Sequence, residues 1–198
     1  LIPDANFEQA LINLGYDTGT PNGSVPTANI DTVTYLNVNH QNISDLTGIE
    51  DFTDLTTLQC YDNQLTALNV SNNIALTTLY CGYTWLGVYG NLLTYLDVSS
   101  NTALTLLECC NNQLTSLDVS QNTALIRLEC GNNQLTSLDV SQNTALTSLE
   151  CWINQLTSLD VSNNTALTHL ACPSNQLTTL DVSNNTALTD LNCNDNQL

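Results

Sequence analysis

Eight cysteines are the most reactive side chains in this 198-residue sequence, and seven of them fall at a regular spacing. The seven recur every 21 residues, with one longer interval, as Cys60, Cys81, Cys109, Cys130, Cys151, Cys172 and Cys193. A zinc site would need converging Cys-x-x-Cys pairs, which are absent, and parallel side chains are poorly aimed for disulfides. Since each takes an apolar position of a repeat, we predict that they fill a narrow apolar core. Cys110 falls at an outward position, so we expect a solvent-facing thiol there.

Carboxylates recur at the same period and could act as an acid–base pair. Glu108, Glu129 and Glu150 lie on successive repeats, and a glycosidase needs two carboxyls roughly 5–10 Å apart. A flat strand surface offers neither a cleft nor exclusion of water, so we expect nothing to raise the pKa of one of them. His40 and His169 are far apart in the array, so no nucleophile–histidine pair is implied. We therefore predict no enzyme activity and no cofactor.

A second acidic row places one aspartate on each repeat. Its members are Asp97, Asp118, Asp139, Asp160 and Asp181, with Asn69 at the head. Like charges about 5 Å apart in water repel by roughly 0.8 kcal/mol per pair. Calcium, hydrogen bonds from nearby Ser and Thr, or solvation could each relieve this repulsion. The Gly-Asp-rich loop of calcium-binding β-rolls is absent, and residues 17–22 lack the carboxylates of a calcium loop. We therefore predict a solvated row and no metal site.

The charge balance excludes several classes of partner. Nineteen acidic residues face one basic residue, Arg127, which gives a formal net charge of −18. Phosphate backbones and anionic membrane surfaces would be repelled, so we predict no nucleic-acid partner and no binding to anionic membranes. No run of apolar residues is long enough for a membrane-spanning helix. Cationic and neutral partners are compatible with this charge.

A 21-residue repeat positions all of these side chains. Units such as LTSLECWINQL (146–156) alternate with units such as TSLDVSQNTA (136–145). The first half-unit reads LxxLxCxxNxL, and the second repeats its spacing as LxxLxVxxN. Over residues 55–198 these motifs resemble the nested 21-residue leucine-rich repeats of bacterial proteins. The resemblance implies a leucine-rich-repeat solenoid, a right-handed coil made mostly of β-strand and turn.

The repeat has a physical reason to stack. Apolar and polar residues alternate within LxxLxC, as a half-buried strand requires, and one such strand cannot bury its apolar face alone. The duplicated half-motif predicts extended segments on both sides of a narrow coil. We expect the asparagines to pair with backbone groups at the coil corners. They form two rows: Asn63, Asn91, Asn112, Asn133, Asn154, Asn175 and Asn196, and Asn73, Asn101, Asn122, Asn143, Asn164 and Asn185.

The N-terminal part differs from the repeats. Residues 1–17 predict a helix that begins after Asp4, ends at Gly15 and turns Phe7, Ala10, Leu11 and Leu14 to one face. Residues 1–32 would form this cap and a Gly/Pro/Asn-rich connection, and residues 33–198 the solenoid, all in one domain. The unit 33–54 resembles the N-terminal flank of internalin-like surface proteins. Because the chain stops within a repeat, we expect it to be part of a longer protein.

The outward positions vary in the first half-unit and barely change in the second. The varied positions include the single Arg and several aromatics, the usual anchors of interfaces. In leucine-rich repeats generally this strand lines the recognition surface. The candidate partner-binding residues are Tyr61, Tyr80, Tyr83, Trp85, Tyr89, Glu108, Arg127, Glu129, Glu150, Trp152 and His169.

An insertion at roughly 84–90 interrupts the period and carries Trp85 and Tyr89. It either folds flat over the adjacent repeat or offers its aromatics to a partner. We predict a monomeric recognition or adhesion module, secreted or at the cell surface, that binds a protein rather than a glycan. Carbohydrate binding within a polysaccharide-degrading system is the main alternative, and a spacer with no ligand is the other.

Overall fold

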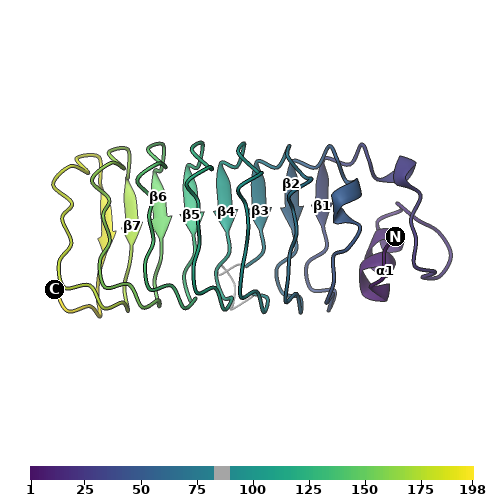
Figure 1. Ribbon diagram of the computed structural model, residues 1–198, viewed down its shortest axis with the longest axis horizontal. Helices are drawn as coiled ribbons and strands as arrows, with labels where there is room; N and C mark the ends of the chain where they lie inside the picture. The colour runs from purple at the N-terminus through teal and green to yellow at the C-terminus, as the bar shows by residue number, and fades with distance from the viewer. Residues whose placement is uncertain (83–89) are drawn as a thin grey trace.

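The computed structural model describes residues 1–82 and 90–198. The insertion residues Tyr83, Trp85 and Tyr89 lie outside this part. The chain forms a row of stacked coils, with the helix α1 at one end and the C-terminus at the other (Figure 1). The elements are α1 (Ala5–Asn13), the 3-10 turns η1 (Thr27–Asn29) and η2 (Ile49–Asp51), and the strands β1 (Tyr35–Asn37), β2 (Thr57–Gln59), β3 (Thr78–Tyr80), β4 (Leu106–Glu108), β5 (Arg127–Glu129), β6 (Ser148–Glu150), β7 (His169–Ala171) and β8 (Asp190–Asn192).

The strands form one parallel eight-stranded sheet in sequence order. Each is three residues long, and in the interior of the sheet the middle leucine is fully buried. The in-register pairing places these leucines in one column: Leu36, Leu58, Leu79, Leu107, Leu128, Leu149, Leu170 and Leu191. The predicted solenoid with a helical cap is thus confirmed.

The cysteines of the repeat lie inside this core. Cys60, Cys81, Cys109, Cys130, Cys151 and Cys172 are fully buried, Cys193 near the last coil is partly buried, and all are free thiols. Burial raises the pKa of the Cys60 thiol to about 12. The prediction that these cysteines act as small apolar side chains is confirmed.

The prediction for Cys110 was wrong, because its side chain is fully buried. Glycines occupy the equivalent position on both neighbouring coils, at Gly82 and Gly131. A Cβ on Gly82 would lie only 1.7 Å from the Cys110 carbonyl oxygen, so the coils close tightly over this position. Burial raises the pKa of this thiol as well, which leaves it unreactive.

The second half of each coil returns the chain to the next strand, and we call it the return half. On this side the described residues form no named strand and show one isolated bridge, Asn69 to Asp97, so the predicted second side carries no second sheet. Turns satisfy the backbone instead. In the central coil, for example, Asp139 Oδ1 accepts a hydrogen bond from the Ser141 amide at 2.9 Å, and the Asn143 amide donates to the Val140 carbonyl at 3.0 Å.

The helix α1 covers the N-terminal end of the core. Asp4 caps it as predicted, since Oδ1 accepts the amides of Asn6 and Phe7 at 2.9 and 3.0 Å. The Phe7 ring stacks on Phe52 of the solenoid with 6.4 Å between centroids. Leu14 was expected on the same face but is 47% exposed, because the helix ends at Asn13 and Gly15 follows in the left-handed region. No helix of the described ranges is long and apolar enough to cross a membrane.

Candidate recognition surface

The candidate site is the outer side of the sheet, which we call the strand face: the outward residues of β2–β8 and the second and third residues after each strand. Pleating sends every second side chain of a strand outward, so the sequence positions that vary between repeats meet on this one surface. Glu108, Glu129 and Glu150 are register neighbours on β4, β5 and β6. The structure therefore gathers these predicted residues into one stripe.

Two basic side chains, Arg127 and His169, contact the carboxylates of this stripe. Arg127 Nε donates to Glu129 Oε1 at 2.6 Å, and its Nη2 lies 3.9 Å from Glu108 Oε1. Further along, His169 Nε2 lies 3.5 Å from Glu150 Oε1, and Nδ1 lies 2.9 Å from Asp190 Oδ2. Asp190 was not among the predicted site residues, although its place one repeat after His169 could have indicated it.

The expectation that nothing would perturb these carboxyls was wrong. Glu108 and Glu129 are each only 2% exposed. Burial raises the pKa of Glu108 to about 8, and repulsion from Glu129 adds to this effect while Arg127 opposes it. Burial also raises the pKa of Glu129, with Glu150 adding repulsion. Two buried carboxyls that share one guanidinium favour a proton on one of them.

Solvent has little access to this perturbed pair. The Arg127 guanidinium bonds Glu129 and faces Glu108, and both carboxyls are closed off from solvent. A substrate would have to reach both. Among the described residues no group of three or more His, Cys, Asp or Glu side chains could hold a metal ion.

Trp152 and Ile153 follow β6 and form the most unusual part of the strand face. The Trp152 ring packs against the preceding coil, where a Cβ on Gly131 would be 2.2 Å from Cε2. Ile153 is 49% exposed and has φ of 47°. Equivalent positions on other coils hold Asp62, Asn111, Asn132, Ser174 and Asp195 at similar φ. A β-branched residue is strained in this left-handed region, whereas Asn and Asp tolerate it.

Ile153 was missed among the candidate residues. The sequence alone could have indicated Ile153, because every equivalent residue of the other described coils is small or polar. Tyr61 and Tyr80 are partly buried, as Trp152 is, and Tyr61 packs edge-on against His40 with 5.4 Å between ring centroids.

Comparison with known structures supports the fold and its class. The functional domain of InlJ from Listeria monocytogenes, which includes a cysteine ladder, is 38% identical to this chain over 98% of its length, with a TM-score of 0.76. The chain is a leucine-rich-repeat protein that resembles the Listeria internalins. It spans 46% of that InlJ chain. The buried cysteines of this leucine-rich-repeat solenoid agree with the ladder described there.

Two further structures share the fold at lower identity. Internalin C2 from Listeria monocytogenes is 20% identical, with a TM-score of 0.68 over 96% of this chain and 94% of its own. A leucine-rich-repeat protein from Leptospira interrogans is 24% identical, with a TM-score of 0.63 over 78% of this chain and 46% of its own. No family model matches the chain, and a search of curated proteins gave no match.

Proposed function

We propose that this solenoid is a non-catalytic recognition module, secreted or displayed on a cell surface, that binds a protein partner through the strand face. Leucine-rich-repeat modules commonly bind proteins, and the resemblance to internalins supports this role here. The variation between repeats is concentrated on the strand face, while the return half keeps nearly the same residues. A partner that spans several coils would contact a different side chain on each coil.

The observation that carries the proposal is the adjacent pair Trp152 and Ile153, of which Trp152 is partly buried and Ile153 is 49% exposed. A strained, half-exposed isoleucine contributes little to the fold, since Asn or Ser is compatible with the same backbone on other coils. Strain of this kind is concentrated at functional sites. Trp152 lies beside Ile153 and packs against Gly131. Trp is enriched among the residues that dominate binding energy.

The charged stripe next to this pair suits a partner with a basic surface. The single Arg of the chain is bonded to Glu129, so it adds little free positive charge. Glu150 and Asp190 are more accessible than Glu108 and Glu129, and they flank His169. A partner with Lys or Arg opposite these two carboxylates would be attracted and oriented by them.

The test begins with capture of a partner from extracts of surface proteins of host or neighbouring cells, followed by measured affinities. We expect Trp152→Ala to weaken binding by about tenfold or more. Ile153→Asn should also weaken binding, yet it should raise the free energy of unfolding by about 1 kcal/mol, because it relieves backbone strain. Loss of binding in a more stable variant cannot be ascribed to unfolding.

Gln142→Ala provides the matched control, since Gln142 is exposed on the return half. Its affinity should equal that of the unmodified protein. If Trp152→Ala and Ile153→Asn bind the captured partner as tightly as the control, the strand face is not the site. Repeated captures that recover no specific partner would favour a spacer.

A further inference from the structure

Tyr95 breaks the uniformity of the return half. The equivalent residues on the other coils are small, namely Ala67, Ser116, Ser137, Ser158 and Thr179. Tyr95 is 65% exposed, so its ring is not needed to fill the core. Its neighbours Thr94, Leu96 and Asp97 follow the common pattern, which means that the fold accepts a serine here and the chain nevertheless carries an aromatic.

Two hollows flank Tyr95, one toward each neighbouring coil. The larger, about 430 Å³, is lined by Thr66, Asn69, Ser71, Thr94, Tyr95 and Asp97, among others. The second, about 310 Å³, is bounded by Tyr95, Asp97, Ser99, Ser116 and Asp118. Tyr95 and Asp97 thus form the wall shared by both.

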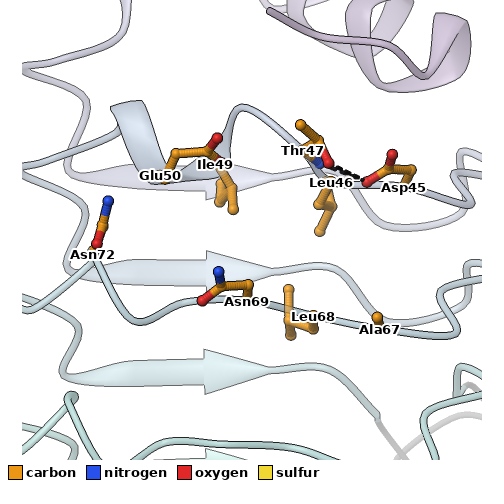
Figure 2. Close-up of a pocket in the computed structure, with 9 residues that line it drawn as sticks. All are labelled: Asp45, Leu46, Thr47, Ile49, Glu50, Ala67, Leu68, Asn69 and Asn72. Atoms are coloured by element: carbon orange, nitrogen blue, oxygen red, sulfur yellow. Dashed lines mark hydrogen bonds between the residues drawn. The ribbon is translucent and has the colours of Figure 1, made fainter.

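Two comparable hollows among the described residues of the return half have no aromatic wall. One of about 370 Å³ is lined by Ser137, Asp139, Ser141, Ser158 and Asp160. Another, of about 380 Å³, is lined by Asp45, Thr47, Glu50 and Asn72 together with apolar residues of the adjacent coils (Figure 2). There Asp45 accepts hydrogen bonds from Thr47. The hollow is therefore a product of the repeat, and the aromatic at Tyr95 is an addition to it.

An exposed aromatic face bordered by hydroxyl, amide and carboxylate groups suits a sugar ring. The C–H face of a pyranose packs on an aromatic, and its hydroxyls need nearby donors and acceptors. Asp97 uses Oδ1 to accept the Ser99 amide at 2.9 Å, and a carboxylate has further lone pairs to accept sugar hydroxyls. The net charge of −18 would repel sulfated or sialylated chains.

We propose that Tyr95 and its two flanking hollows form a binding site for a hexose unit of a neutral glycan. The ring stacks on Tyr95, and Asp97 accepts hydrogen bonds from the sugar hydroxyls. This site lies on the return half and does not depend on the protein-binding role of the strand face. Either function can be present without the other.

The test is an array of neutral gluco-, manno-, galacto- and N-acetylglucosamine oligosaccharides, with sulfated and sialylated chains for comparison. The best neutral binder is then measured by isothermal titration calorimetry. We expect Tyr95→Ser to weaken its binding by about tenfold or more. Tyr95→Ser recreates the residue of the next coils, so its melting temperature should not change.

Two further variants sharpen the result. Ser137→Tyr places the ring beside Asp139 and the hollow that lacks it, and should raise the stoichiometry from one sugar chain to two. Ile153→Asn on the strand face should bind the glycan normally. The proposal fails if no neutral oligosaccharide binds, if Tyr95→Ser binds as tightly as the unmodified protein, or if Ser137→Tyr adds no second site.

Discussion

At the scale of single residues, the strand face buries two carboxyl groups beside a single guanidinium. Glu108 and Glu129 are buried side by side, and one guanidinium faces both. The Oε2 atom of Glu108 is buried with no hydrogen-bond partner. Leaving such an oxygen ionised is costly in a low-dielectric setting. We therefore expect Glu108 to keep its proton in the folded protein at neutral pH and to release it on unfolding.

This proton makes stability depend on pH. The pKa of Glu108 is about 8 in the folded protein, and about 4.3 in an unfolded chain. The raised pKa adds stability that is complete below the lower value and is lost as the pH rises through the higher one. We expect the free energy of unfolding to fall between about pH 5 and about pH 8, and Glu108→Gln to flatten this fall.

Chemical denaturation at several pH values measures this effect. Glu50→Gln is the comparison, since Glu50 lies in a different part of the chain, at η2. Glu50→Gln should retain the pH dependence of the unmodified protein. If Glu108→Gln shows the same slope as that comparison, Glu108 is ionised in the folded state and the inference is wrong.

At the scale of the repeated elements, the asparagine rows join one coil to the next. Asn133 Nδ2 donates to the carbonyls of Cys109 and Cys130 at 3.1 and 3.0 Å, and Oδ1 accepts the Leu114 amide at 3.0 Å. Asn143, in the other row, donates to the carbonyls of Val119 and Asn122, but its Oδ1 is buried without a partner. Only the first row satisfies both ends of the amide.

This difference predicts unequal costs for the two rows. Asn133→Ala leaves the buried Leu114 amide unpaired and removes one of the two asparagine donors from each of the Cys109 and Cys130 carbonyls. It should lower the free energy of unfolding by about 1–3 kcal/mol. Asn143→Ala should cost less, because it also removes an unpaired oxygen. Urea denaturation measures both, with exposed Gln134→Ala as the neutral control. Equal costs in the two rows would show that the buried Oδ1 atoms carry no penalty.

The sequence predicts these elements well because each is dictated by local spacing. The leucine and cysteine period, the Asp4 cap and the asparagine corners all follow from residues within one or two coils. The burial of Cys110 and Glu108 could not be predicted in the same way, since it depends on what the adjacent coils carry. Gly82 and Gly131 let the coils close over Cys110. Ile153 and Tyr95 were visible as departures from the pattern, but only the structure shows that both are exposed.

At the scale of the whole molecule, the stacked coils place many negative charges close together. Each coil of the return half adds an aspartate one coil from the last, and the net charge is −18. Hydrogen bonds oppose the repulsion: the Ser141 amide and side chain lower the pKa of Asp139, and similar bonds lower the pKa of Asp97, Asp118, Asp160 and Asp181. Each carboxylate is thus held in its charged form by its own turn.

This arrangement predicts a general response to salt rather than a calcium site. Raising NaCl from about 0.02 M to about 0.5 M shortens the range of the repulsion and should raise the melting temperature. CaCl2 at the same ionic strength should give no larger rise in melting temperature. Calcium needs six to eight oxygen ligands, whereas the Asp row offers only one carboxylate per coil. Differential scanning calorimetry in both salts measures the effect. A larger rise with calcium that a chelator abolishes would show that the Asp row binds the ion.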